Sequence, residues 1–130
     1  MSKEFLLDTH AFLWWVTDDE RLSNKAHEII SDGSNTIYVS SATAWEIAIK
    51  AGLKRLELPG EPRQWFFEQL ASNGFDTLSV DIAHSLKTYQ LPMVHRDPFD
   101  RMLVAQAMEE RVTLITCDRN IRVYPGDFIW

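Results

Sequence analysis

The sequence predicts an α/β fold in which helices cover a mostly parallel β-sheet. Short apolar or β-branched segments alternate along the chain with longer segments whose apolar residues recur at helical spacing. No Asn-Gly pair joins two of the strand-like segments, so helices are expected to connect the strands. The length of 130 residues and the 45% share of apolar residues fit one globular domain over residues 1–130.

The first half of the chain is expected to contain two strands and three helices. Phe5–Leu7 is an all-apolar run, typical of a strand that is buried on both faces. Next come an apolar helix over Ala11–Val16 and a helix over Ser23–Ile30 whose serine acts as the cap. The β-branched and aromatic segment Thr36–Ser40 predicts the second strand. Helical spacing of apolar residues over Ala42–Ala51 then predicts a third helix.

The second half of the chain continues this alternation. Pro62 and Pro98 suit the first turn of a helix, Gly74 suits a helix end, and Asp81 and Asp97 are placed as helix caps. The expected elements are helices over Pro62–Gly74, Asp81–Tyr89 and Pro98–Glu110, and strands over Thr77–Val80, Val112–Thr116 and Asp127–Trp130.

Charge and cysteine content limit the possible functions. The 13 Lys and Arg residues against 19 Asp and Glu residues give a net charge of −6, which excludes nucleic-acid binding by a general basic field. An acidic chain can still act on phosphates if some carboxylates bind a divalent metal ion. The single Cys117 excludes a disulfide framework, and no apolar run approaches the roughly 20 residues of a membrane span. A cytoplasmic protein is expected.

Four carboxylates are expected at the carboxyl edge of the sheet, where open α/β sheets place their sites. Asp8 directly follows the first strand, and Asp118 lies just beyond the strand that ends at Thr116. Glu46 and Asp100 each lie in the first turns of a helix that starts at this edge. Packing several carboxylates together is costly without a cation, and oxygen-only ligation suits Mg²⁺ or Mn²⁺.

Each of these acids also has an ordinary structural interpretation. Asp8 is placed to cap a helix, Thr43–Glu46 fits a capping box, Asp97–Asp100 puts an acid behind an aspartate cap, and Asp118 suits a turn. These roles explain the acids singly. They do not explain why all four converge on one edge.

Other residue patterns exclude further chemistries. The four histidines have no i, i+4 pair, and only His10 and His95 lie near the proposed edge. No Gly-x-Ser-x-Gly elbow and no phosphate-binding glycine loop is present. Basic residues placed to steer a phosphate strand are Lys50, Lys54, Arg55, Arg96, Arg101, Arg119 and Arg122. Lys50 also fits an i, i+4 partner of Glu46.

Four motifs, in order along the whole chain, resemble the PIN domain of VapC-type toxins. They are Leu6-Leu7-Asp8-Thr9-His10, Ser40-Ser41-x4-Glu46-Ile47, Asp97-Pro98-Phe99-Asp100-Arg101-Met102-Leu103-Val104-Ala105-Gln106-Ala107 and Leu114-Ile115-Thr116-Cys117-Asp118. The resemblance implies a PIN-like three-layer sandwich, an endoribonuclease dependent on Mg²⁺ or Mn²⁺, and a small antitoxin partner. It implies that the catalytic metal ligands are Asp8, Glu46, Asp100 and Asp118, with Thr116 as a supporting hydroxyl.

Three further expectations accompany this resemblance. Asp97 is expected to be a helix cap and not a ligand. His10 stands where asparagine is frequent in the family, which leaves the ligand set intact. The aromatic stretches Ala11–Val16 and Trp65–Phe67 exceed what one small core readily buries, so a homodimer or an antitoxin helix is expected to cover part of them.

Two alternative functions remain open at this point. The chain could be a PIN-like binding module that pairs with an antitoxin without cleaving RNA, although its intact acids argue against this. It could also be a metal-dependent phosphatase or a DNA nuclease on a similar sheet. RNA cleavage with and without EDTA distinguishes these possibilities.

Overall fold

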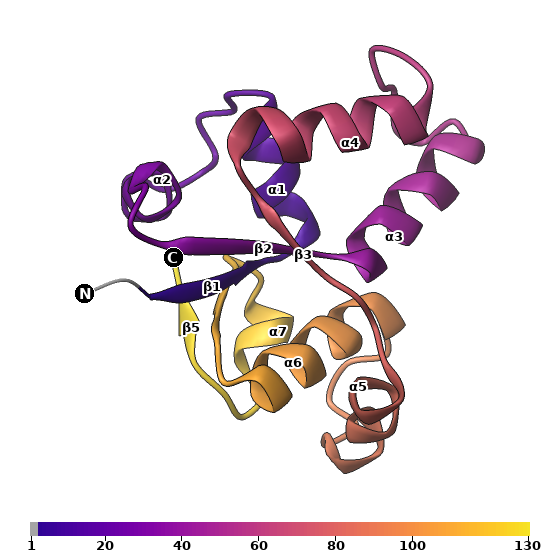
Figure 1. Cartoon of the computed structure of the whole chain (residues 1–130). Coiled ribbons are helices and arrows are strands. Elements are labelled where there is room, and N and C mark those ends of the chain that lie inside the picture. The colour runs from indigo at the N-terminus through magenta and orange to yellow at the C-terminus, as the bar shows by residue number, and fades with distance from the viewer. Residues whose placement is uncertain (1–2) are drawn as a thin grey trace.

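The computed structural model describes residues 3–130, which form one five-stranded sheet with helices on both faces (Figure 1). The strands are β1 (Glu4–Leu7), β2 (Thr36–Ser40), β3 (Asp76–Leu78), β4 (Thr113–Ile115) and β5 (Phe128–Ile129). Their order across the sheet is β3-β2-β1-β4-β5, and every pairing is parallel. The predicted α/β sandwich with a mostly parallel sheet is therefore confirmed.

Helices occupy both faces of the sheet. They are α1 (Thr9–Val16), α2 (Asn24–Ser31), α3 (Ser41–Gly52), α4 (Pro62–Asn73), α5 (Ile82–Lys87), the 3₁₀ helix η1 (Thr88–Gln90), α6 (Pro98–Glu110) and α7 (Arg119–Arg122). In Figure 1, α1, α2 and α4 lie above the sheet, and α5, α6 and α7 lie below it. No helix within residues 3–130 combines the length and apolar character that crossing a membrane requires.

The central strand β1 contributes to two hydrophobic cores, one on each face. Phe5 and Leu7 pack in a cluster with Phe12 of α1 and Trp65 of α4. Leu6 points the other way, into a cluster with residues of α6, β4 and α7. Burying each leucine of this strand contributes roughly 1.5–3 kcal/mol to folding. The double burial predicted from the all-apolar run is confirmed, and it fixes the strand whose end carries Asp8.

Two local predictions about caps are wrong. Helix α3 is capped by the Ser40 hydroxyl, which accepts a hydrogen bond from the Ala42 backbone N–H at 2.9 Å, so Thr43 is not a cap. Thr43 lies within the helix and is buried, because the chain turns directly from β2 into α3. Asp118 does not form a simple turn. It caps the short helix α7.

The aromatic stretches are packed more fully than the sequence suggests. Phe12 and Trp65 are buried, and Trp14 and Trp15 are partly buried against the same core. The Trp15 indole N–H also donates to the Asn73 side chain at 2.9 Å. Phe67 differs, because 60% of it is exposed on α4. Of these two stretches, α4 therefore leaves the more exposed aromatic side chain, Phe67.

Candidate active site

Asp8 lies where β1 ends and α1 begins, and its carboxylate is almost wholly buried. Its Oδ1 accepts a hydrogen bond from the Ala11 backbone N–H at 2.7 Å, so the residue does cap α1. Burial raises the pKa of this carboxyl, while hydrogen bonds with Thr116 and Ala11 act in the opposite direction. The cap and the acid at the sheet edge are thus the same residue.

Glu46 projects from α3 with both carboxylate oxygens engaged. Oε1 accepts a hydrogen bond from the Thr9 hydroxyl at 2.7 Å, and Oε2 lies 2.7 Å from the Lys50 ammonium. Glu46 is buried, so this charge needs a partner to be stable. Lys50 is therefore the i, i+4 partner that the sequence allowed. Its cation is engaged with Glu46 rather than free to steer phosphate.

Asp100 lies in the first turn of α6 beside a histidine. Asp97 caps this helix, as predicted, through hydrogen bonds to its Oδ1 from the backbone N–H groups of Phe99 (2.8 Å) and Asp100 (3.2 Å). His95 Nε2 lies 2.9 Å from Asp100 Oδ2. Burial and the negative charge of Asp97 raise the pKa of Asp100 to about 7, against the opposing hydrogen bond from His95.

Asp118 lies just beyond β4 and completes the edge. Its carboxylate accepts a hydrogen bond from the Asn120 backbone N–H at 2.8 Å, and its own backbone N–H donates to the Thr116 hydroxyl at 3.0 Å. Thr116 thus contacts both Asp8 and Asp118, which is the supporting position expected for it.

Electrostatic effects show that the four acids are neighbours. The charge of Asp118 raises the pKa values of both Asp8 and Asp100, and the charge of Glu46 also raises that of Asp100. The tightest group is a different one, however. Within residues 3–130, ligand atoms of His95, Asp97 and Asp100 all lie within 4.8 Å of one another, whereas Asp8, Glu46 and Asp118 belong to no group that tight. The four carboxylates are therefore linked by pairwise electrostatic effects, but they do not form one tight group.

Arg101 secures the loop that carries His95, a role that the sequence did not reveal. Its guanidinium donates hydrogen bonds to the backbone carbonyls of Pro92 and Thr88, each at 2.9 Å, and to the Tyr124 hydroxyl at 3.1 Å. The Tyr124 hydroxyl in turn donates to the His95 carbonyl at 2.9 Å. The prediction that Arg101 steers a phosphate strand is wrong, because its donors are committed to this loop.

A second group of ligand-type side chains has a structural role. His84 is buried, its Nδ1 accepts a hydrogen bond from the Asp81 backbone N–H, and its Nε2 lies 2.9 Å from Glu110 Oε2. This arrangement closes a capping box at the start of α5 and ties that helix to α6. The Asp81–His84–Glu110 group is thereby satisfied within the fold.

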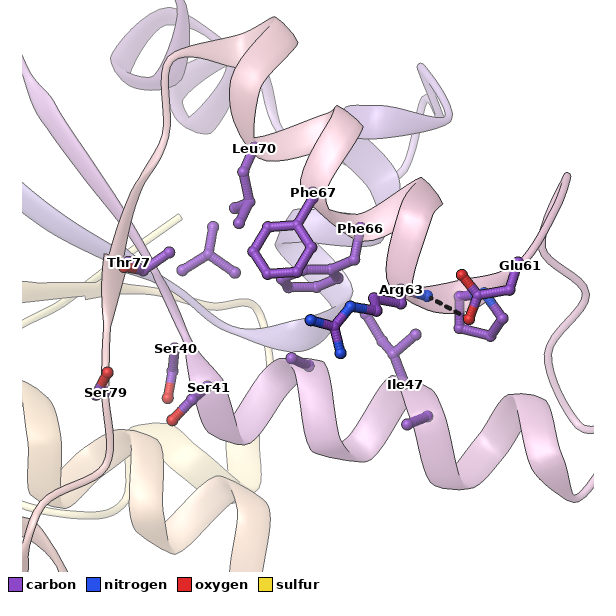
Figure 2. A pocket seen from close by; sticks show the side chains of 14 residues that line it. Ser40, Ser41, Ile47, Glu61, Arg63, Phe66, Phe67, Leu70, Thr77 and Ser79 are labelled. Carbon is purple, nitrogen blue, oxygen red and sulfur yellow. Dashed lines mark hydrogen bonds between the residues drawn. The ribbon is translucent and has the colours of Figure 1, made fainter.

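An apolar groove lies between α3 and α4 beside the edge strand β3 (Figure 2). Its volume is about 590 Å³. Phe66, Phe67 and Leu70 project into it from α4, and Ile47 lines it from α3. Arg63 and Glu61 stand at one end of the groove, as Figure 2 shows. The groove has the dimensions and surface to hold side chains of another polypeptide.

The donor set at the sheet edge fits a hard divalent cation. Carboxylate oxygens from four separate segments are the ligands that Mg²⁺ and Mn²⁺ prefer, and no cysteine is among them. The raised pKa of Asp100 and of Asp8 reflects negative charge and burial that a cation would offset. The geometry thus suits metal-assisted chemistry on an anionic substrate.

A parallel α/β sheet with an acidic, metal-suited carboxyl edge defines the class of protein. The chain belongs to the PIN domain family, which residues 5–127 match. It is homologous to ribonuclease VapC22 of Mycobacterium tuberculosis, with 30% identity over 118 residues, 90% of this chain and 88% of the relative.

Solved structures with the same fold include two of VapBC bound to DNA. One is VapBC2 from Rickettsia felis bound to a promoter DNA fragment, with a TM-score of 0.70, 13% identity and 97% of each chain covered. The other is DNA-bound VapBC from Salmonella typhimurium, with a TM-score of 0.70, 20% identity and 98% and 97% covered. At these identities the likeness concerns the fold.

Proposed function

We propose that this protein is a metal-dependent endoribonuclease that acts as the toxin of a toxin–antitoxin pair. The observation that carries the proposal is the meeting of Asp8, Glu46, Asp100 and Asp118 at one sheet edge in a homologue of a ribonuclease. The four carboxylates need added positive charge to hold an anionic phosphodiester, and Lys50 is already paired with Glu46. A divalent metal ion supplies the missing charge.

In this proposal the four carboxylates hold Mg²⁺ or Mn²⁺, and their neighbours orient them. Thr9 fixes one oxygen of Glu46, Thr116 and the Ala11 backbone N–H fix Asp8, and His95 fixes Asp100. The metal ion, when bound, lowers the pKa of a water molecule and stabilises charge on the phosphate oxygens. The buried threonine hydroxyls keep the carboxylates in place without adding charge.

We further propose that the groove between α3 and α4 holds a segment of a small antitoxin. The support is its apolar lining, its volume of about 590 Å³ and the exposed ring of Phe67. An amphipathic helix or strand would bury these residues. Replacing Phe67 by Asp should weaken the complex with the protein encoded beside this gene at least tenfold in a titration, because a buried unpaired carboxylate costs several kcal/mol.

We also propose a homodimer through the outer surface of α5, η1 and the segment that follows η1. This surface exposes large apolar side chains that no part of residues 3–130 covers, namely Ile82, Leu86, Tyr89, Met93 and Val94. A self-complementary apolar patch is what a two-fold dimer requires. Light scattering should show a dimer that Leu86→Asp converts to monomer, and a strictly monomeric wild type would exclude it.

Cleavage of RNA decides the main proposal. Total cellular RNA, incubated with the purified protein in Mg²⁺ or Mn²⁺, should be cut at sites that end sequencing maps, and EDTA should stop the reaction. A silent binding module would leave the RNA intact. Cleavage of DNA alone, or release of inorganic phosphate without chain cleavage, would favour the alternative enzymes.

A further inference from the structure

A second groove, about 430 Å³ in volume, opens directly beside the acidic edge. Glu46 and Asp97 line it on the side of the carboxylates, and Phe99 lies next to them. Three cations also line it: Lys50, Arg55 and Arg96. This groove is distinct from the apolar groove between α3 and α4, because the two share no lining residue.

An aromatic pair adjoins this groove, since Phe99 lines it and the exposed Trp45 packs on Phe99. Trp45 is 65% exposed and packs edge-to-face on Phe99, with ring centroids 5.3 Å apart and planes at 77°. Trp45 immediately precedes Glu46 in the chain, and Phe99 immediately precedes Asp100. Trp45 belongs to neither hydrophobic core. Its large ring therefore faces solvent within one residue of the acids, where folding alone does not require it.

Two of the three cations are available to a ligand. Within residues 3–130, Lys50 pairs with Glu46, whereas neither Arg55 nor Arg96 makes a salt bridge or a side-chain hydrogen bond. Both arginines are exposed. Their guanidinium groups present donors in a planar fork that suits phosphate oxygens. In a chain of net charge −6, the lining of this groove holds three cations against two carboxylates.

We propose that this groove is a nucleotide-binding subsite for single-stranded RNA, in which a base stacks on Trp45 and adjacent phosphates bind Arg55 and Arg96. The inference rests on the proposed ribonuclease function. It adds the path that the RNA strand takes next to the bond that is cleaved. An unpaired base exposes the ring face that stacking on tryptophan needs, which a duplex does not. The arginines would hold the backbone so that a neighbouring phosphodiester meets the carboxylate centre.

A second copy of this chain is the competing occupant. Trp45, Ile49 and Leu53 form an exposed stripe on α3 that another apolar surface would cover. An apolar partner would also remove Arg55 and Arg96 from water without giving them a counter-charge, and that is costly. Phosphate groups supply this counter-charge. The charges of the groove therefore favour RNA.

RNA binding by variants tests the subsite. Affinity is measured by fluorescence anisotropy with a short labelled single-stranded oligoribonucleotide in Mg²⁺, with Asp8→Asn in every protein to prevent cleavage. Trp45→Ala should weaken binding about tenfold, because stacking on an aromatic ring is worth about 1–3 kcal/mol per base. Trp45→Phe should restore most of the affinity. Equal affinities for the Ala, Phe and parent proteins would overturn the proposal.

Salt dependence separates the roles of the aromatic and the cationic residues. Arg96→Ala should reduce the slope of log affinity against log salt concentration by about 0.7, the value for one phosphate contact on a single strand. Trp45→Ala should leave this slope unchanged, and so should Lys25→Ala on α2, which removes an equal charge from a helix with no part in the groove. An unchanged slope for Arg96→Ala would contradict the phosphate contact.

Sedimentation of the same proteins distinguishes RNA from a second copy. If Trp45→Ala loses affinity only where it also dissociates a dimer, the residue belongs to a self-interface and the subsite is excluded. Failure of the wild type to cleave RNA would reject the proposed function, and that outcome is separate, because the affinities are measured without cleavage. Mn²⁺ binding, followed by electron paramagnetic resonance in proteins that keep Asp8, should be the same with and without Trp45→Ala.

Discussion

Asp8 and Asp100 both interact with the charge of Asp118, but the chain supports them in opposite ways. Asp8 continues a strand that is buried on both faces, and its carboxylate is held by the first turn of α1. Asp100 stands on a helix that follows an irregular segment, and its carboxylate contacts His95 from that segment. One acid depends on the sheet, and the other depends on a loop that Arg101 and Tyr124 secure.

The site therefore has a sheet-supported half, which carries Asp8, and a loop-supported half, which carries Asp100. Different parts of the fold hold the two halves in place. Displacing Asp8 requires disrupting the central pairing of β1 with β2 and β4. Displacing His95, which contacts the Asp100 carboxylate, requires only loss of a few side-chain hydrogen bonds, because few backbone bonds hold residues 91–97. Substitutions on the two sides should therefore differ in what they damage.

The largest expected effect is on the rate of RNA cleavage, and it should be similar for acids in both halves of the site. Asp8→Asn, Glu46→Gln, Asp100→Asn and Asp118→Asn should each lower the rate of RNA cleavage about a hundredfold or more, because each removes a metal ligand. Asp97→Asn is the matched control. Asparagine caps a helix as well as aspartate does, so its rate should stay close to wild type. Equal losses at Asp97 and Asp100 would show that the ligand has been assigned wrongly.

Arg101→Ala should affect the loop-supported half selectively. It removes charge-assisted hydrogen bonds to two carbonyls and a hydroxyl, and the free energy of unfolding should fall by about 2–3 kcal/mol in urea denaturation. Arg101→Lys should rescue little of this, since one ammonium cannot reach the same acceptors. Lys25→Ala should change stability by less than about 0.5 kcal/mol. A similarly small change for Arg101→Ala would contradict the support role.

Asp100→Asn should raise the melting temperature in EDTA, and the gain should depend on pH. The folded pKa of about 7 lies above the unfolded value, so the folded state binds the proton more tightly. The ionised carboxyl therefore destabilises the fold increasingly as pH rises from about 4 through 7. The gain from Asn should be largest above pH 7 and vanish below pH 4.

The metal ion should reverse this order of stability. In millimolar Mn²⁺ the wild type should melt above Asp100→Asn, because only the complete ligand set binds the ion tightly and binding stabilises the native state. Asp8→Asn should follow the same pattern, since burial raises the pKa of Asp8 as well. Thermal melts in EDTA and in Mn²⁺ check both variants. If both variants melt below the wild type by the same amount in EDTA and in Mn²⁺, these acids are only helix caps.

Tyr124→Phe should have the smallest effect on stability, and its effect should be confined to residues 91–97. It keeps the buried ring and removes the hydroxyl that links Arg101 to the His95 carbonyl, at a cost of about 1 kcal/mol. Hydrogen exchange should become faster in residues 91–97 and stay unchanged in β1. Faster exchange in β1 would show that the two halves are coupled after all.

The sequence revealed the sheet-supported half better than the loop-supported half. An apolar run that stops at Asp8 is a local signal, and the strand, the cap and the acid can all be inferred from adjacent residues. The proline after Asp97 likewise predicts its cap and the helix that carries Asp100. Periodicity and capping rules depend on near neighbours, so they succeed for these elements.

Contacts between distant residues could not be inferred in this way. Arg101 was interpreted as a cation for phosphate, because nothing near it in the chain indicates that Thr88, Pro92 and Tyr124 would engage its donors. The pairing of Thr9 with Glu46 depends on the approach of α1 to α3. The exposure of Trp45 was missed too, since helical spacing does not say which aromatic rings a core will leave out.

The central place of β1 has a consequence for the order in which the acidic edge is assembled. Phe5 pairs with Ile37 on one side and with Thr113 on the other, so this strand joins one partner that is close in the sequence and one that is far along it. Closing so long a loop is slow, and the N-terminal segments fold first against each other. Asp8 and Glu46 can come together early, but Asp118 joins them only after β4 has been synthesised. The carboxylate edge is therefore complete only after β1 has paired with β4 across most of the length of the chain.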